Sequence, residues 1–352
     1  MLQREARLKQ VLFQEKLGSY WDKTQRVLFL LPRLAQAAGQ PVPLADLQKA
    51  AHLMKCDLVT EMVREFTDLQ GIVGGLYARA EGYSENVWRA VYEQYLPHST
   101  ASHSPSGKAG ALLSLADRLD TVCGCFSVGL MPSSSGDPFA LRRQGNAILK
   151  IILDHGLSLS LAELVSWGLE AVDRPDAGTA EQIRGFFEGR LRFLLAEKGF
   201  AYDCLNAALA AGCDDPQDAF ERVRAIEAMR GEADFLALAA GFKRIANILA
   251  KTNEAGQEPD PARMTESAEV ALWQRYSVLR PAVEAARRAK EYDGALRLLA
   301  SMRSDVDLFF DKVLVMADDP AVRSNRLALL RQLADLFLGI ADISQIVIDQ
   351  TR

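Results

Sequence analysis

The feature that most constrains the fold of this chain is a helical spacing of apolar residues that continues along almost its whole length. Leu44, Leu47, Ala51 and Met54 follow one another at steps of three and four, which places their side chains on one face of an α-helix. Runs in which apolar and polar residues alternate, the pattern of a half-buried strand, are missing from the sequence. The spacing therefore predicts an all-α protein.

Breaker clusters divide this pattern into separate helices. We expect a first long helix from about Glu5 to just before Gly39, and a second that begins near Leu44. Ser104–Gly107 interrupts the pattern before a further helix over Ala109–Val122.

Residues suited to capping predict several helix starts. Asp137 is a good N-cap, and Pro138 after it suits the first helical position. Ser160 and Thr179 each precede a Glu or Gln by three residues, which is the spacing of a capping box.

The helices fall into three successive segments. We predict a helical domain over 1–158, a helical middle region over 159–250 and a C-terminal helical bundle over 251–352. Thr252–Arg263 holds two prolines and a glycine and is the best linker candidate in the second half. The last helix has the clearest apolar seam, with its residues at a/d spacing: Leu327, Leu330, Ala334, Phe337 and Ala341.

Composition and charge are those of an ordinary globular protein. Of the 352 residues, 49% are hydrophobic and 25% are charged. The formal net charge of -5 argues against a nonspecific nucleic-acid binder, although a local basic face remains open. The sequence has no apolar run long enough to cross a bilayer, and its charged, amphipathic start does not resemble a signal peptide. We expect a cytoplasmic protein whose partners include neither a membrane nor DNA.

The cysteines are odd in number and form no C-x-x-C pair, which argues against a zinc knuckle. Their apolar helical surroundings are typical of buried, reduced thiols. They are Cys56, Cys123, Cys125, Cys204 and Cys213.

The layout of the first segment resembles the HD-domain superfamily, in which a His, a His-Asp doublet and a later Asp ligate a metal. Matching helix to helix places these ligands at Lys23, Cys56, Asp57 and Asp117. Two of the four ligands are thus lost, and two carboxylates alone make a poor transition-metal site. We expect no metal here, with Asp57 and Asp117 paired to Lys23 or Arg118 instead. The hypothesis is an HD-like fold without hydrolase activity.

No catalytic constellation stands out, so we predict no catalytic residues. His52 lies one turn before Cys56, but a lone helical histidine is more often a core or surface residue than a ligand. The glycine-rich segment Gly71–Gly75 lacks the G-x-x-x-x-G-K pattern of a phosphate loop. The signature motifs of both aminoacyl-adenylating enzyme classes are missing as well.

Basic residues on helix faces are more informative. Lys243, Asn247 and Lys251 recur every four residues, with Arg244 beside them, which is the geometry of a phosphate-contacting row with one amide for a base edge or a sugar. An ordinary solvated helix face explains the spacing equally well.

Two further arginine pairs have the same two interpretations. Arg323 and Arg326 flank the apolar seam of the last helix, either for a partner or as surface charge. Arg142 and Arg143 follow the Asp137 cap and diverge by about 100° on a helix. At most one of those two is expected to face a shared partner, while the other pairs with an acid such as Asp137.

Several segments closely resemble the β subunit of bacterial glycyl-tRNA synthetase. They are Phe13–Gly18, Trp21–Thr24, Lys55–Val63, Glu65–Gly71, Leu115–Thr121, Ser135–Arg143 and Lys243–Leu249. Three more resemble the helical, DALR-type anticodon-binding domain shared with arginyl-tRNA synthetase: Phe309–Met316, Asn325–Leu330 and Ala341–Ser344.

The resemblance implies part of an enzyme that joins glycine to its tRNA. In that family the α subunit holds the adenylation site, and ATP and magnesium are used by the holoenzyme, an α2β2 assembly. No cofactor is expected on this chain, and its expected partners are glycine tRNA and the α subunit. Because the family's β subunit is about twice as long, we expect a truncated or separately encoded C-terminal half.

The resemblance also implies which residues contact tRNA. The HD-like half would use Arg142 and Arg143. The C-terminal half would use Lys243, Arg244, Asn247, Lys251, Arg323, Asn325 and Arg326. Two other classes of function compete with this one, a metal-dependent phosphohydrolase and a non-catalytic helical interaction scaffold.

Overall fold

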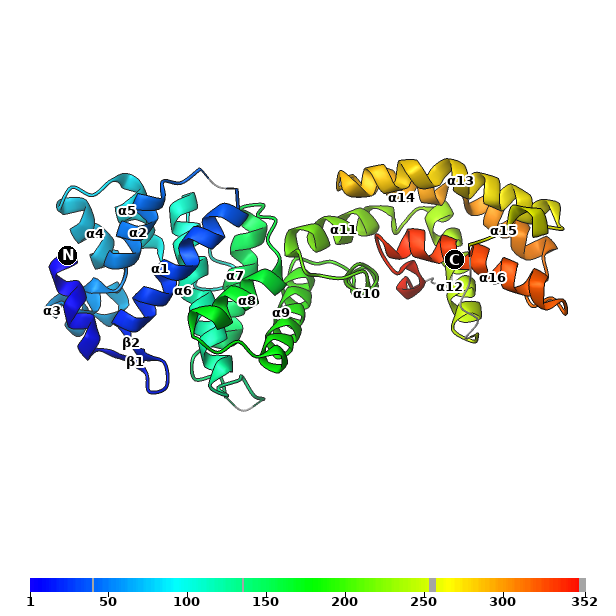
Figure 1. Cartoon of the computed structure of the whole chain (residues 1–352). Helices are drawn as coiled ribbons and strands as arrows, with labels where there is room; N and C mark the ends of the chain where they lie inside the picture. Colours follow the sequence, from blue (N-terminus) through cyan, green and yellow to red (C-terminus); the bar gives the residue numbers. More distant parts are fainter. Residues whose placement is uncertain (40, 135, 253–257, 348–352) are drawn as a thin grey trace. The chain divides into compact units, whose positions relative to one another are not determined.

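The computed structural model describes residues 1–39, 41–134, 136–252 and 258–347. Within these ranges sixteen α-helices make up most of the structure, with five short 3₁₀ helices and one two-stranded hairpin (Figure 1). The all-α prediction is therefore confirmed. The chain forms two compact units: unit 1 is Met1–Leu194 with Asp214–Gln217, and unit 2 is Leu195–Cys213 with Asp218–Arg352.

Unit 1 begins with a 3₁₀ helix and the hairpin and then continues as helices. Its first elements are η1 (Leu2–Gln10), β1 (Leu12–Gln14), β2 (Gly18–Ser19), α1 (Tyr20–Ala37), α2 (Leu44–Leu53), η2 (Cys56–Val59), α3 (Glu61–Glu65) and η3 (Thr67–Leu69). They are followed by α4 (Ile72–Ala80), α5 (Glu85–Glu93), α6 (Lys108–Ser127), α7 (Leu141–Asp154), α8 (Leu161–Ala171) and α9 (Ala177–Glu197), whose last residues belong to unit 2.

The expected single helix from Glu5 to Gly39 is wrong, because the hairpin divides it. Gly18, the first residue of β2, adopts a φ of +84°, and a Cβ there would meet the carboxylate of Asp22. Ser19 and Asp22 then form a capping box that starts α1 afresh. The Ser-x-x-Asp spacing was a start signal that the helical pattern obscured.

Helix α6 is the centre of unit 1. Every residue from Ala109 to Phe126 is buried, and the helix contacts α1, α5, α7 and α8 (Figure 1). A helix buried on all sides has no solvated face on which to place its charged residues. The charges on α6 must therefore find partners inside the protein.

The start of α7 differs from the prediction. The carboxylate of Asp137 does accept from first-turn amides, those of Leu141 at 2.6 Å and Arg142 at 3.0 Å. The helix itself begins only at Leu141, after Ala140 in a left-handed conformation with φ +52°. Pro138 is thus not the first helical residue, because a turn separates it from the helix.

The other predicted helix signals give mixed results. Ser160 caps α8 through the Glu163 amide, and Gly156 stands after α7 with a φ of +61°. Thr179 is not a cap, since α9 has already begun at Ala177 and the Thr179 amide donates to Asp176.

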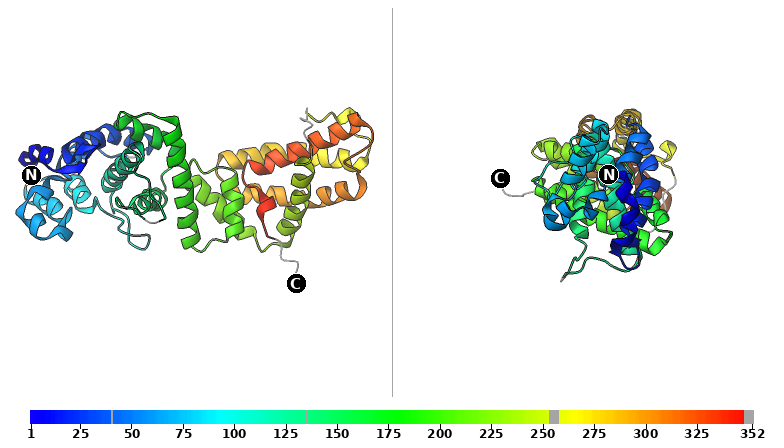
Figure 2. Two further views of the ribbon diagram at one scale, coloured as in Figure 1. Left: turned by 90° about the horizontal axis from the view of Figure 1, so that it is seen from below. Right: turned by 90° about the vertical axis from the view of Figure 1, so that its left-hand side faces the viewer.

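Unit 2 is built almost entirely from α-helices within the described ranges. Its elements are α10 (Tyr202–Ala210), α11 (Pro216–Met229), α12 (Ala233–Leu249), η4 (Pro261–Arg263), α13 (Ser267–Arg288), α14 (Tyr292–Ala300), α15 (Arg303–Lys312), α16 (Pro320–Leu338) and η5 (Ile343–Gln345). The last helix, α16, packs against α12 and α13 (Figure 2). Four residues of its predicted seam, Leu327, Leu330, Ala334 and Phe337, are buried on α16, which confirms the apolar face. Ala341 is buried as well, but it lies beyond the end of α16 at Leu338, so its place on the helix was predicted wrongly.

The compact units do not follow the predicted segments. The three-part division at 158 and 250 stays a prediction, and α8 from the predicted middle region packs against α6 in unit 1. Of the predicted linker Thr252–Arg263, residues 253–257 lie outside the described ranges. No helix in the described ranges has both the length and the apolar character that a bilayer crossing requires.

Candidate functional site

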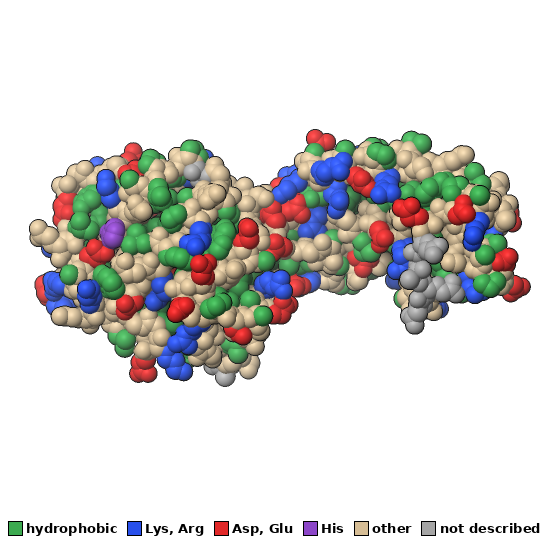
Figure 3. All heavy atoms as spheres, in the orientation of Figure 1, with side chains coloured by type: hydrophobic (Ala, Val, Ile, Leu, Met, Phe, Trp, Pro, Cys, Tyr) green, Lys and Arg blue, Asp and Glu red, His purple; other side chains and the backbone are tan. Residues whose placement is uncertain are grey.

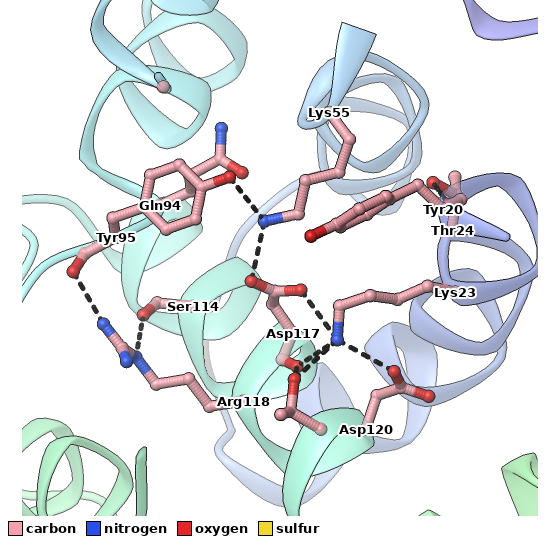
Figure 4. Close-up of polar contacts among 12 residues, drawn as sticks. Tyr20, Lys23, Thr24, Lys55, Gln94, Tyr95, Ser114, Asp117, Arg118 and Asp120 are labelled. Atoms are coloured by element: carbon pink, nitrogen blue, oxygen red, sulfur yellow. Dashed lines mark hydrogen bonds and ion pairs between the residues drawn. The ribbon is translucent and has the colours of Figure 1, made fainter. Parts of the chain in front are cut away.

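A buried charge network joins α6 to α1 and to the segment after α2 (Figure 4). The Lys23 ammonium lies 3.1 Å from the Asp117 carboxylate and 2.8 Å from that of Asp120, and it donates to the Thr121 hydroxyl at 2.7 Å. From the other side, Lys55 reaches Asp117 at 2.9 Å. Two ammonium groups thus hold one carboxylate.

This pairing decides the charge state of Asp117. Burial alone would raise the pKa of Asp117, but the charges of Lys23 and Lys55 outweigh burial and hold that pKa below its usual value. The predicted pairing of Asp117 with Lys23 is confirmed. The role of Lys55 was missed, because nothing in the local sequence connects it to a residue 62 positions away.

Asp57 is held differently from the prediction. Its carboxylate accepts from the amides of Gly71 at 2.6 Å and Gly74 at 3.2 Å, at the start of α4. A Cβ on Gly74 would lie 3.0 Å from the Asp57 oxygen, so this glycine allows the close approach, while Gly71 supplies its amide from a backbone with a φ of +81°. Burial raises the pKa of Asp57, and the Gly71 amide opposes that effect. The expectation of an ion pair with Lys23 or Arg118 is wrong.

The remaining candidate metal positions are engaged in other contacts. The Cys56 thiol donates to the His52 carbonyl at 3.1 Å, and burial raises the Cys56 pKa to about 12. The His52 ring lies 2.7 Å from a Glu5 oxygen. In the part of the chain that the structure describes, no group of three or more His, Cys, Asp or Glu residues could hold a metal.

Beside the network lies a hollow of about 460 Å³. Four basic side chains line it, together with the carboxylates of Asp68 and Asp117. The basic residues are Lys23, Lys55, Arg118 and Arg143. The aromatic and imidazole side chains at its wall are Phe13, Tyr20, Tyr95, His98 and Phe139.

Arg142 and Arg143 at the start of α7 have different surroundings, as their spacing on a helix implies. The Arg142 guanidinium donates to the Ser133 carbonyl at 2.6 Å, in the preceding loop. Its expected acidic partner Asp137 instead accepts from the Arg142 backbone amide. Arg143 is exposed and lines the hollow.

Helix α12 in unit 2 presents the predicted basic row. Lys243, Arg244 and Asn247 are exposed, and so is Lys251 just after the helix ends. Phe242 and Ile245 on the other face of the helix are buried, so the row faces solvent while the apolar face packs inward. The Arg244 guanidinium lies over the Phe310 ring, 4.3 Å from its centroid.

The three predicted tRNA contacts on α16 are less exposed than the row on α12. Arg326 is buried, forms an ion pair with buried Glu269 and donates to the Leu314 carbonyl at 2.7 Å. Asn325 is buried too, and its amide bonds the backbone of Asp260 at 2.6 and 3.1 Å. These two side chains are used in internal contacts, so we do not retain them as tRNA contacts. Arg323 is half-buried and donates to the Ala317 carbonyl at 3.0 Å.

The second half of the chain matches a known class of RNA-binding domain. Residues 238–343, which span α12 to α16, match the model described as the DALR anticodon binding domain. The chain is thus one that carries a helical anticodon-binding domain. Residues 1–210 match the model described as glycyl-tRNA synthetase beta subunit. The chain belongs to the glycyl-tRNA synthetase β-subunit family, as its resemblance implied.

Individual relatives agree with this assignment. Proteins named glycine–tRNA ligase beta subunit from Acidobacterium capsulatum and Desulfatibacillum aliphaticivorans are each 43% identical, and one from Acinetobacter baumannii is 42% identical. Each match covers 97% of this chain and 50% of the relative. The chain therefore spans about half the length of the curated relatives it matches.

Proposed function

We propose that this chain is the tRNA-binding part of the β subunit of glycine–tRNA ligase. It would support the ATP-dependent attachment of glycine to its tRNA, in the cytoplasm, within an α2β2 assembly whose α subunit carries out adenylation with ATP and magnesium. Family membership and the names of the relatives support this role. The observation that carries it is the exposed basic row on α12, inside the region that matches an anticodon-binding domain.

The chemistry of the row suits a single-stranded RNA loop. Lys243 and Lys251 supply charge for phosphates, and Asn247 between them has an amide that can bond a base edge. Arg244 is already positioned by its contact with Phe310, so it loses less side-chain freedom on binding. Basic and acidic side chains are intermingled over the face shown in Figure 3. Binding would therefore depend on this local row rather than on a broad basic surface.

For unit 1 we propose an HD-like domain without hydrolase activity. A metal ion at the position of the lost ligands would stand beside the ammonium groups of Lys23 and Lys55. Like charges at such distances repel strongly in a buried site. Phosphodiesterase turnover with added manganese, lost on Asp57→Ala, would instead support the hydrolase alternative.

The row is tested by the double variant Lys243→Ala/Lys251→Ala in a mobility-shift titration with glycine tRNA over a salt series. Removing two phosphate contacts should weaken binding about tenfold or more near 0.1 M salt and lower the log–log salt slope by about 1.4–1.8. Arg224→Ala is the matched control. Arg224 is an exposed arginine of α11 that pairs with Glu221 three residues earlier.

An unchanged slope in the double variant would contradict the assignment of the row. If the chain binds no tRNA at any salt concentration while remaining folded, the scaffold alternative becomes the better interpretation. Equal losses in the double variant and in Arg224→Ala would show that the effect is one of total charge rather than of this row.

A further inference from the structure

The hollow of unit 1 holds more buried positive charge than its carboxylates balance. Lys23 and Lys55 share Asp117, and Asp120 behind them pairs with both Lys23 and Arg26. These three cations meet two carboxylates in ion pairs, the charge of Lys55 also acts on buried Asp57, and Asp68 lines the hollow. Within the described ranges the excess positive charge of the hollow therefore comes from Arg118 and Arg143.

Arg118 adds a buried guanidinium that has no carboxylate in ion-pair contact among the described residues. It is 6% exposed, and its acceptors in the described part of the chain are the neutral oxygens of Ser114, Gln144, Tyr95 and Pro97. Burial lowers the Arg118 pKa to about 10, and the charge of Asp117 only partly offsets this. A buried charge without a counter-ion is costly, and an anion in the hollow would supply one.

Two groups at the rim extend the positive field. Arg143 is exposed, lines the hollow and has no ion pair within the described ranges. The neighbouring His98 responds to this field: burial lowers its pKa first, and the charges of Arg118 and Arg143 lower it further. An anion bound between the two arginines would reverse that part of the effect.

The size and walls of the hollow indicate the kind of anion. About 460 Å³ is room for a single nucleotide and not for a duplex. Two aromatic faces are already covered, Tyr95 by Lys55 and Phe13 by Lys23. Phe139 is half-buried at the wall and has no ring or cation contact among the described residues, so its face is available to stack a base.

We propose that this hollow is a binding site for one unpaired nucleotide, whose phosphate lies between Arg118 and Arg143 and whose base stacks on Phe139. The nucleotide is either free or part of a single-stranded stretch of RNA, because both present the same phosphate and ring. The site belongs to unit 1, whereas the proposed tRNA row belongs to α12 of unit 2.

The test is equilibrium dialysis of the full chain with AMP, adenosine, inorganic phosphate and a single-stranded trinucleotide RNA. AMP should bind saturably and adenosine about tenfold more weakly, since only AMP has the charge-assisted contacts. Arg143→Gln should weaken AMP binding about tenfold and Phe139→Ala about fivefold. Arg64→Gln, on an exposed arginine of α3, is the matched control and should bind AMP like the unmodified chain.

NMR of the His98 ring gives a second measurement that does not depend on affinity. Saturating AMP should raise the His98 pKa in the unmodified chain and not in Arg143→Gln. Tighter binding of the trinucleotide than of AMP assigns the site to RNA, whereas equal binding assigns it to free nucleotides, and both results support the proposal.

Three results would overturn it: no saturable binding of either AMP or the trinucleotide, equal binding of adenosine and AMP, or unchanged AMP binding by Arg143→Gln. The variant Lys243→Ala/Lys251→Ala should still bind AMP. Failure of the α12 row and failure of this site are thus distinguishable.

Discussion

Asp117 is the residue on which the interior charge of unit 1 depends. It lies on a helix that is buried on every side, and it is kept ionised there only by Lys23 and Lys55. Removing the carboxylate would leave the buried Lys55 ammonium without its ion-pair partner, while Lys23 would keep only Asp120. Its removal should therefore cost more than that of an exposed acid.

Asp117→Asn should lower the free energy of unfolding by about 3 kcal/mol at neutral pH. Because the Asp117 pKa is lower in the folded than in the unfolded chain, its contribution is complete above the ordinary carboxyl pKa of about 4 and declines as pH falls below that. Urea unfolding at pH 7 and pH 3 should show the variant's deficit shrinking at the lower pH. Asp68→Asn, an exposed acid of the same hollow, is the control. A deficit equal at both pH values would contradict the assignment.

Arg326 shows how a binding residue and a structural residue can look alike in sequence. Arg326→Ala should destabilise unit 2 by about 3–5 kcal/mol, because it leaves the buried Glu269 carboxylate without its partner. Chemical denaturation of Arg326→Ala, Glu269→Ala and the double variant measures the coupling between them. Full stability with weakened tRNA binding would restore Arg326 as an RNA contact.

Among single residues, some contacts could be predicted from the sequence, and others could not because only the fold creates them. The pairing of Lys23 with Asp117 could be predicted from matched helix positions. Burial of Arg326 has a signal in the sequence, since Arg326 lies one turn before Leu330 on the same face of α16. The cradle of Asp57 had no such local signal, because only the fold brings it to the start of α4.

At the scale of elements, α4 and α5 approach so closely that one glycine decides their contact. A Cβ on Gly75 would lie 2.4 Å from the Tyr92 Cβ and 2.7 Å from its Cα. Since that neighbour is backbone, the helices themselves would have to move apart. The helical pattern of the sequence predicts both segments but not the distance between them.

Gly75→Ala should therefore destabilise unit 1 by about 1–3 kcal/mol through overpacking. Gly189→Ala is the matched control, because that glycine is exposed within α9 and a Cβ there meets nothing within 4 Å. The control should stabilise the chain by up to about 1 kcal/mol. Thermal unfolding of both variants tests the difference, and two changes of the same sign would contradict it.

At the scale of the whole molecule, the chain has two hydrophobic cores rather than one. Helix α6 is central to unit 1, and the seam of α16 packs within unit 2. The helical character of both was predictable from apolar spacing. The boundary between them was not, because α9 continues as one helix from one unit into the next.

A cavity made in one core should mainly affect its own unit. Leu112→Ala on α6 and Leu330→Ala on α16 each remove a fully buried side chain and should each cost about 2–5 kcal/mol. Hydrogen exchange followed by mass spectrometry should show faster exchange in the unit that carries the substitution. Equal acceleration in both units for either variant would indicate one cooperative structure instead.

The buried charge network limits how early unit 1 can fold while the chain is being synthesised. Lys23 precedes its partner Asp120 by 97 residues. At a synthesis rate of roughly 5–20 residues per second, the ribosome takes roughly 5–20 s to produce the acid after the lysine. Until α6 emerges, α1 and α2 have no central helix to pack against and the cations of α1 have no counter-charge. Unit 1 is therefore expected to fold late and as a whole, and nascent chains that end before α6 should be protease-sensitive.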